Sequence, residues 1–303
     1  MQIGQTPLIK LERMAPANGV EIWVKWEGAN PTGSMKDRMA LSMVLGAEQR
    51  GQLRPGGRVV DYTGGSTGSS LAMVCAARGY QAHFVSSDAF SEEKLQTMRA
   101  FGARLDVVPS ANSKVTPDLI HTCLERVRVL AAEPNTFWTD QFNNPDNRAG
   151  YYHMADETLT ALAERLDEYV MMVGTGGSFA GNAEVLKARV PGVRCIAGEP
   201  AASQVLSGLA PTGGHRIEGT GAGFVPGIHR ADLVDAVMAV TDEDAFATAR
   251  RLAREEGIFG GISSGANVWM ALQRASHLPP GARIVTTICD SGLKYLRGDL
   301  YRS

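Results

Sequence analysis

The sequence lacks any apolar run of membrane-spanning length, and its N-terminus lacks a signal-peptide pattern. It also lacks a marked excess of either charge, because its formal net charge is -2. That balance gives no reason to expect nucleic acid or an anionic membrane as a partner. The composition, 44% hydrophobic and 20% charged, is typical of a soluble globular protein. We therefore expect a cytoplasmic protein that binds neither nucleic acid nor membrane.

Paired cysteines are also missing. The four cysteines, Cys75, Cys123, Cys195 and Cys289, are widely spaced, and no C-x-x-C pair or histidine cluster accompanies them. Each lies in or beside an apolar stretch, so we expect buried free thiols, with no disulfide and no metal site. A catalytic cysteine is the alternative.

Two nucleotide-binding patterns are absent from the glycine-rich segment Gly174–Ser178. It is not G-x-x-x-x-G-K-[ST], and it is no clean G-x-G-x-x-G followed by an acidic ribose-binding residue. It does follow an apolar strand and precede a helical stretch, where main-chain N–H groups favour a phosphate. Thr175 and Ser178 can add hydroxyl donors. A plain strand-to-helix turn is the alternative.

Two further glycine-rich turns follow the same pattern. Residues 63–68 (Thr-Gly-Gly-Ser-Thr-Gly) lie between a predicted strand and helix and can hold a carboxylate or another anion. Residues 260–266 open a predicted helix, where Ser263 or Ser264 is either a helix N-cap or a hydroxyl donor to a ligand. For both segments, a purely structural turn is the alternative.

One lysine is placed unusually. Lys36 follows a Pro-Thr-Gly-Ser turn at a position where a helix is expected to begin. Most lysines on helices are solvated, and that is the structural alternative. The positive end of a helix disfavours an ammonium group, which suits an amine that acts as a nucleophile and base.

Short β-rich runs alternate with helical stretches along the 303 residues, which are enough for two domains. We expect strands at 58–62, 81–85, 105–108, 136–139, 169–173, 193–197, 236–240 and 283–288. We expect helices at 69–78, 92–101, 118–132, 148–165, 179–188, 243–256 and 266–275. The alternation predicts an α/β fold with mostly parallel sheets. Residues 207–224 are expected to form a mobile flap or an ordinary surface loop.

In order along nearly the whole chain, these segments resemble the cysteine synthase family, the O-acetylserine sulfhydrylases and their relatives among fold-type II pyridoxal phosphate (PLP) enzymes. Residues 4–8 resemble the family's opening G-x-T-P-L, and residues 30–38 resemble its N-P-x-x-S-x-K-D-R segment. Residues 141–145 resemble Q-F-x-N-P, and residues 174–178 match the family's phosphate loop. Further counterparts lie at 198–200, 221–226, 261–265 and 290–292.

The resemblance implies a two-domain fold-type II enzyme, similar to the β subunit of tryptophan synthase, with mostly parallel twisted sheets and helices on both faces. A small mobile substrate domain would span residues 34–135. A large cofactor-binding domain would comprise residues 1–33 and 136–303. A homodimer is also implied.

The resemblance also implies roles for individual residues. Lys36 would hold PLP as a Schiff base and later move the substrate's α-proton. Ser263 would hydrogen-bond the pyridine nitrogen, and as a neutral partner it would disfavour transamination and racemisation relative to β-elimination. The cofactor phosphate would be held by Gly174, Thr175, Gly176, Gly177 and Ser178. The substrate carboxylate would be surrounded by Thr63, Gly64, Ser66, Thr67 and Gln141.

The substrate loop departs from the family's usual T-S-G-N-T-G. Gly64 stands in place of the serine, and Ser66 in place of an asparagine that is expected to touch the cofactor's phenolic oxygen. Ser66 is shorter and has no amide N–H in its side chain, although it stays a candidate for that cofactor contact. Tyr62, just before the loop, is a further candidate to point into the site. The departure leaves the amino-acid substrate and the nucleophile open.

The resemblance implies a transferase or lyase that carries out β-replacement or β-elimination on an O-activated serine or on cysteine, through an α-aminoacrylate. Cysteine synthase, which makes cysteine and acetate from O-acetylserine and sulfide, is the leading activity. The alternatives are a cysteine desulfhydrase or other β-eliminase, a serine or threonine dehydratase, and a non-enzymatic amino-acid-binding module. Because the chain ends at Ser303, we do not expect the appended regulatory domain of a full cystathionine synthase.

Overall fold

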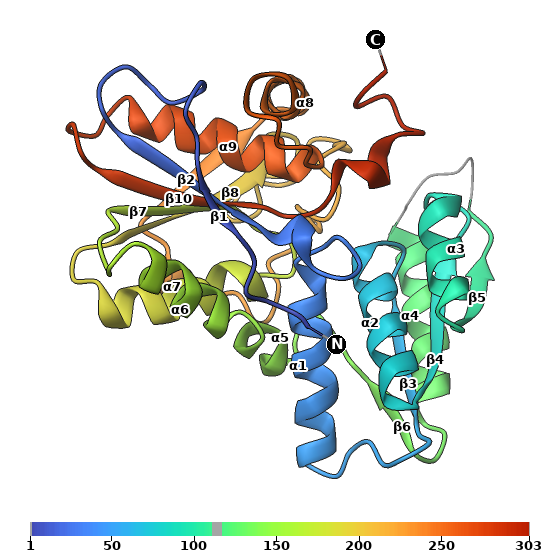
Figure 1. Cartoon of the computed structure of the whole chain (residues 1–303). Helices are drawn as coiled ribbons and strands as arrows, with labels where there is room; N and C mark the ends of the chain where they lie inside the picture. The colour runs from blue at the N-terminus through green and yellow to red at the C-terminus, as the bar shows by residue number, and fades with distance from the viewer. Residues whose placement is uncertain (1, 111–116, 303) are drawn as a thin grey trace. The chain divides into compact units, whose positions relative to one another are not determined.

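The computed structural model describes residues 2–110 and 117–302, and the chain divides into two units (Figure 1). The small unit contains residues 36–150. The large unit contains residues 2–35 together with the chain from residue 151 onward. In the described part of the chain, no helix combines the length and the apolar character that crossing a membrane requires.

The large unit is built on a six-stranded sheet with the order β1-β2-β10-β7-β8-β9. Its first strand pairs antiparallel with the second, and all other neighbours are parallel. The strands are β1 (Leu8–Lys10), β2 (Glu21–Trp26), β10 (Arg283–Ile288), β7 (Glu168–Met172), β8 (Arg194–Pro200) and β9 (Ala236–Val240).

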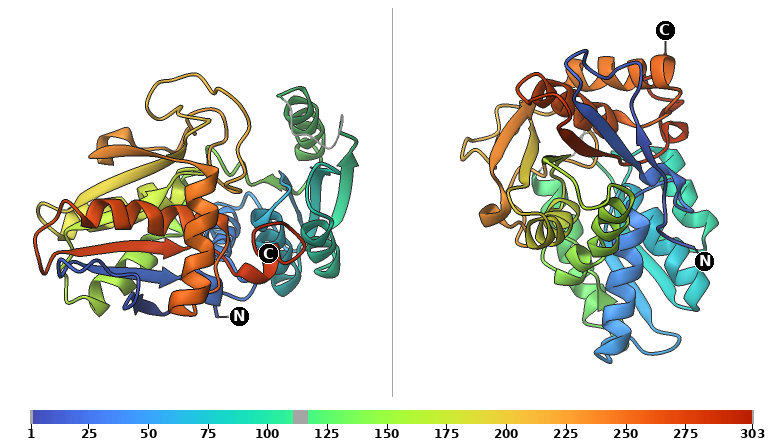
Figure 2. Two further views of the ribbon diagram at one scale, coloured as in Figure 1. Left: turned by 90° about the horizontal axis from the view of Figure 1, so that it is seen from above. Right: turned by 60° about the vertical axis from the view of Figure 1, so that its left-hand side comes forward.

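Helices cover both faces of this sheet. Helices α6 (Tyr152–Ala161) and α7 (Gly177–Arg189) lie on one face, and α8 (Asp242–Arg251) and α9 (Ile262–Ala275) lie on the other. The left panel of Figure 2 views this unit with α8 and α9 in front of the sheet. A short π-helical turn (Leu252–Glu256) extends α8. Every residue of β7 is buried, as expected for a central parallel strand covered on both sides.

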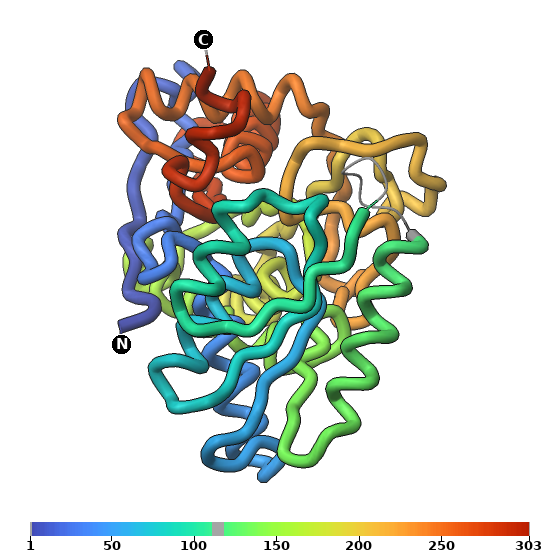
Figure 3. Tube along the Cα trace, turned by 90° about the vertical axis from the view of Figure 1, so that its right-hand side faces the viewer, coloured from blue at the N-terminus to red at the C-terminus, as the bar shows by residue number. Residues whose placement is uncertain are grey.

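The small unit has a four-stranded parallel sheet with the order β5-β4-β3-β6. Its strands are β3 (Arg58–Tyr62), β4 (Gln81–Ser87), β5 (Arg104–Val108) and β6 (Thr136–Trp138). Helices α2 (Ser66–Arg78) and α3 (Glu92–Ala100) cover one face, and α4 (Pro117–Ala131) covers the other (Figure 3, α4 in green). Helix α1 (Lys36–Gln49) packs against α2 and the short α5 (Pro145–Ala149).

The predicted α/β class with mostly parallel sheets is confirmed. The strands predicted at 58–62, 236–240 and 283–288 match the structure residue for residue. The single helix predicted over 148–165 is wrong, because the chain forms α5 and α6 with Gly150 and Tyr151 between them. Strands β1 and β2 were not predicted.

The division into units differs from the expected boundaries at 34 and 135. Strand β6 pairs with β3 and is part of the small unit's sheet. The small unit therefore continues to Gly150, where α5 ends against α1.

Candidate active site

The carboxyl ends of β2, β10 and β7 lie at one edge of the large unit's sheet, because these strands are parallel neighbours. Ligands of open parallel sheets bind at this edge. Strand β7 leads directly into the loop Gly174–Ser178, and β10 leads into Cys289 and Asp290. The segment after β2 ends at Met35. The predicted phosphate loop is therefore at the ligand-binding edge of its sheet.

The backbone of this loop requires glycine. Gly176 caps α7 in the left-handed conformation, with φ of 88°. A Cβ atom at Gly174 would lie 2.1 Å from the carbonyl oxygen of Gly219. The first N–H groups of α7 have no partner within the helix, and the positive end of the helix dipole favours an anion there. Thr175 and Ser178 are buried beside them, and the Ser178 hydroxyl lies 3.2 Å from the sulfur of Met171.

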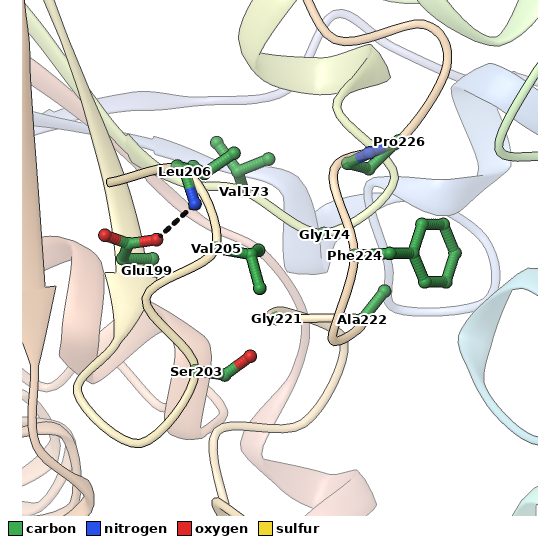
Figure 4. A pocket seen from close by; sticks show the side chains of 10 residues that line it. All are labelled: Val173, Gly174, Glu199, Ser203, Val205, Leu206, Gly221, Ala222, Phe224 and Pro226. Atoms are coloured by element: carbon green, nitrogen blue, oxygen red, sulfur yellow. Dashed lines mark hydrogen bonds between the residues drawn. The ribbon is translucent and has the colours of Figure 1, made fainter. Parts of the chain in front are cut away.

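A small cavity borders Gly174 on the side of the 199–226 segment (Figure 4). The buried carboxylate of Glu199 accepts hydrogen bonds from the main-chain N–H of Leu206, at 2.7 Å, and from the hydroxyl of Ser207. The N–H of Gly221 donates to the carbonyl oxygen of Val173 at 3.1 Å. These bonds attach both ends of the predicted flap, residues 207–224, to the carboxyl ends of β7 and β8.

Ser263 lies in the first turn of α9 and is buried. The N-cap of this helix is Gly261, so the structural alternative, in which Ser263 or Ser264 caps the helix, is wrong. The Ser264 hydroxyl accepts a hydrogen bond from the N–H of Cys289 at 3.0 Å. The Ser263 hydroxyl makes no hydrogen bond to the described residues, so Ser263 is the serine that can hydrogen-bond to a ligand.

Asn267 sets the position of α9 on the sheet. Its Oδ1 accepts from the N–H of Met172 at 2.7 Å, and its Nδ2 donates to the carbonyl oxygen of Thr287 at 2.7 Å. Both partners lie at the carboxyl ends of their strands, β7 and β10. The start of α9, with Ser263, is therefore held near the edge that carries the phosphate loop.

Lys36 is the first residue of α1, and the preceding residues are bonded to the end of β10. The N–H of Met35 donates to the carbonyl oxygen of Cys289 at 2.9 Å, and Ser34 forms an isolated antiparallel bridge with Asp290. The chain therefore leaves the large unit at the ligand-binding edge of its sheet. The Lys36 side chain is half-buried, unlike a solvated lysine on a helix surface.

The predicted substrate-loop residues lie together with Gln141 in the small unit. The Thr63 hydroxyl accepts from the N–H of Gly68 at 3.0 Å, which closes the loop. The Thr67 hydroxyl donates to Oε1 of Gln141 at 3.0 Å, and Nε2 of Gln141 donates to the carbonyl oxygen of Tyr62 at 3.2 Å. Ser66 begins α2, so the loop also presents a helix N-terminus.

Asp61 fixes the two strands that carry this loop and was not singled out from the sequence. Its buried carboxylate accepts from the Thr139 hydroxyl at 2.5 Å, from Nε1 of Trp138 at 3.2 Å and from the N–H of Tyr62 at 2.8 Å. Burial is the main cause that raises the pKa of Asp61 to about 7. An aspartate inside an apolar strand was the available sequence signal.

The ring of Phe90 explains why residue 64 is a glycine. A Cβ atom at Gly64 would lie 2.0 Å from two carbon atoms of the Phe90 ring. The Tyr62 ring packs against a buried cluster that includes Cys123 of α4, and it lies 6.2 Å from the Phe90 ring, centroid to centroid. Nothing in the sequence around Phe90 indicates this contact, because it joins two loops distant in the chain.

The prediction of buried free thiols is confirmed for all four cysteines. Burial raises the pKa of Cys75 and of Cys195 to about 12, and that of Cys123 to about 11. Thiols in this state are protonated near neutral pH and are poor nucleophiles. These three cysteines therefore do not suit nucleophilic catalysis.

A family model described as pyridoxal-phosphate-dependent enzyme matches residues 1–290. The chain belongs to the pyridoxal-phosphate-dependent enzyme family. It is 38% identical to a cysteine synthase from Staphylococcus aureus (strain Mu50 / ATCC 700699), over 99% of this chain and 95% of that protein. The predicted family and cofactor are thus confirmed, and the chain is a cysteine synthase-like enzyme.

Solved structures of the family differ in the reactions that their names give. The crystal structure of O-ureido-L-serine synthase has a TM-score of 0.92 and 38% identity, and it matches over 99% of this chain and 93% of that one. A hydrogen sulfide-producing enzyme from Fusobacterium nucleatum has a TM-score of 0.90 and 37% identity, over 97% of this chain and 96% of that one. These relatives share the fold and leave the substrate of this chain open.

The large unit fits the cofactor of the family. The start of α7, with Gly176 at its N-cap and the buried hydroxyl residues Thr175 and Ser178 beside it, suits a phosphate group. The hydroxyl of Ser263 can donate a hydrogen bond to an unprotonated ring nitrogen. Both groups lie at the carboxyl edge of one sheet, where the fold places ligands.

Proposed function

We propose that this enzyme exchanges or removes the β-substituent of an O-activated serine or of cysteine, and that its leading activity is cysteine synthesis from O-acetylserine and sulfide. The observation that carries the proposal is the loop at the start of α2, in which the Thr63 hydroxyl accepts from the N–H of Gly68 and the Thr67 hydroxyl donates to Gln141. A helix N-terminus flanked by hydroxyl and amide groups suits the α-carboxylate of an amino acid. The full-length likeness to cysteine synthases supports the same reaction class.

Each residue then has a defined task. The loop Gly174–Ser178 holds the cofactor phosphate, and Ser263 meets the pyridine nitrogen. PLP, when bound, supplies the electron sink that makes the α-proton of the amino acid acidic. Lys36 anchors the cofactor, and its Nζ then takes the α-proton as a general base. The substrate loop, with Gly64 and Ser66, orients the carboxylate so that the β-substituent can leave.

The first alternative is a cysteine desulfhydrase or other β-eliminase. It is favoured by the altered substrate loop, where Gly64 and Ser66 replace the usual serine and asparagine. A hydrogen sulfide-producing relative with 37% identity supports it as well. Homodimer formation, a cytoplasmic location and movement of the small unit on substrate binding stay predictions.

Product analysis tests the proposal. The PLP-loaded enzyme is incubated with O-acetylserine and sulfide, and separately with cysteine alone. Cysteine formation in the first reaction supports the synthase. Pyruvate and sulfide from cysteine, without synthesis in the first reaction, would favour the eliminase. Inactivity with both would contradict the proposed substrates.

A further inference from the structure

The ring of Phe90 occupies the space into which a side chain at residue 64 would point. An ideal Cβ at Gly64 would lie 2.0 Å from Cδ2 and Cγ of Phe90 and 2.4 Å from Cδ1. Real Cβ atoms do not approach ring carbons so closely. The glycine in the substrate loop and the aromatic ring beside it are therefore a matched pair.

Phe90 is held at this place by the ends of two neighbouring strands. Strands β3 and β4 are parallel, so the loop after Tyr62 and the turn after Ser87 leave the sheet at the same edge. In that turn, the N–H of Phe90 donates to the carbonyl oxygen of Ser87 at 3.2 Å, and the N–H of Ala89 donates to the Ser87 hydroxyl at 3.2 Å. The Tyr62 ring supports the Phe90 ring from the side of the small unit's core.

The replacement of the family's usual serine by Gly64, with the Phe90 ring beside it, changes the chemistry next to the substrate loop. A serine at position 64 would present a hydroxyl group, whereas here an aromatic ring stands in the same direction. The Phe90 side chain is only half-buried, so part of its apolar surface is available for contact. In an amino acid, only the α-carbon separates the carboxylate from the β-carbon, so a chain of a few carbons can reach from the loop to this ring.

We propose that Phe90 is a specificity-determining residue that selects amino acids whose β-substituent is extended and apolar. This inference rests on the proposed function, in which the Thr63–Thr67 loop binds the substrate carboxylate. Burial of each methylene against the ring contributes up to about fourfold in affinity, from ~0.8 kcal/mol per methylene. If two methylenes reach the ring, the gain is up to about fifteenfold for full burial, and about tenfold for the partial burial of a half-buried ring.

The test measures binding, so it does not depend on turnover. Dissociation constants of L-alanine, L-2-aminobutyrate, L-norvaline and L-norleucine are determined by isothermal titration calorimetry with the PLP-loaded protein. We expect the wild type to bind norleucine about tenfold more tightly than alanine. Phe90→Ala should reduce this ratio to about twofold or less, and Phe90→Leu should retain most of it.

Phe101→Ala is the matched control, since Phe101 is also half-buried but follows the other end of α3. It should leave the ratio unchanged. Gly64→Ser should weaken binding of alanine and of norleucine alike, and Phe90→Ala in the same chain should restore alanine binding, because the ring no longer blocks the side chain.

Three outcomes overturn the inference: a wild type without preference for norleucine, an equal ratio in wild type and Phe90→Ala, or an equal fall in Phe101→Ala. Wild-type protein that binds none of the four amino acids would contradict the proposed function itself, and the inference would fall with it. Circular dichroism and PLP absorbance verify that each variant is folded and loaded.

Discussion

Replacing Asp61 with asparagine should change how the stability of the protein depends on pH. The substitution keeps the shape and most of the hydrogen bonds. The amide oxygen can accept from Trp138 and Tyr62, and the amide N–H can donate to the Thr139 hydroxyl. What is lost is the ability to ionise, so the effect of the buried charge can be measured almost alone.

The sign follows from the direction of the pKa shift. The pKa of Asp61 rises from 3.8 to about 7 on folding, mainly through burial. Between these values the folded state binds more protons at Asp61 than the unfolded state, so the contribution of Asp61 to stability is greatest below about pH 4 and falls as the pH rises to about 7. A difference of about three pKa units corresponds to roughly 4 kcal/mol.

The assay is urea denaturation of wild type and Asp61→Asn at several pH values from 4 to 8. The free energy of unfolding of the variant, relative to wild type, should rise by roughly 4 kcal/mol across this range. A relative stability that stays constant would refute the reasoning, because it would mean that Asp61 titrates normally in the folded protein.

Asp88→Asn provides the control. Asp88 is exposed, and hydrogen bonds from Ser110 lower its pKa. A lowered pKa contributes stability that is present above the unfolded value and lost as the pH falls. The free energy of unfolding of Asp88→Asn, relative to wild type, should therefore change little from pH 4 to 8. Any change should have the opposite sign to that of Asp61→Asn.

Three further predictions concern the site. Gly176→Ala should weaken PLP binding by about tenfold or more in a spectroscopic titration, because residue 176 has φ of 88° at the start of α7. The control is Gly192→Ala, at a glycine with φ of 84° and no atom near its Cβ position, which should lower stability but leave the affinity for PLP unchanged. Ser264→Ala should lower the free energy of unfolding by about 1–3 kcal/mol, because the buried N–H of Cys289 loses its acceptor, whereas Ser263→Ala should leave stability unchanged and shift the absorbance of bound PLP. Gln141→Ala should raise the KM for the amino acid more than it lowers kcat, since Gln141 bonds to Thr67 and to the end of β3. An unchanged KM would mean that Gln141 does not contribute to binding of the amino acid.

Much of the fold was predictable because short runs rich in β-branched and apolar residues mark the central strands. The run at 283–288 (Arg-Ile-Val-Thr-Thr-Ile) is an example, and its bounds are those of β10. Strand β2 was missed because Lys25 interrupts its apolar pattern. That lysine is buried, with its Nζ 2.6 Å from Glu157 and 2.6 Å from the carbonyl oxygen of Thr6, and such partners cannot be inferred from local sequence.

The break between α5 and α6 also depends on tertiary structure. A Cβ atom at Gly150 would lie 2.9 Å from the carbonyl oxygen of Arg38 and from the Cα of Met39. This close approach to α1, together with the change of unit at Gly150, stops a helix that the local sequence favours. Local propensity is a weak guide where another element packs so tightly.

The site was predictable only where a motif is continuous in the chain. The phosphate loop and the substrate loop are each a short run of glycine and hydroxyl residues, and their place between strand and helix follows from the pattern. Asp61 and Phe90 act through residues that are far away in the sequence. Gly64 was therefore recognised as unusual, but its cause became visible only with the ring of Phe90 beside it.

The central claim is that Lys36 is the residue that binds PLP. Reduction of the loaded enzyme with borohydride fixes the cofactor to the amine that holds it, and peptide mass spectrometry locates the modification. We expect it on Lys36, with no modification after Lys36→Ala and full modification after Lys10→Ala, which removes a surface lysine paired with Glu21. Modification of any other residue in the wild type would contradict the account.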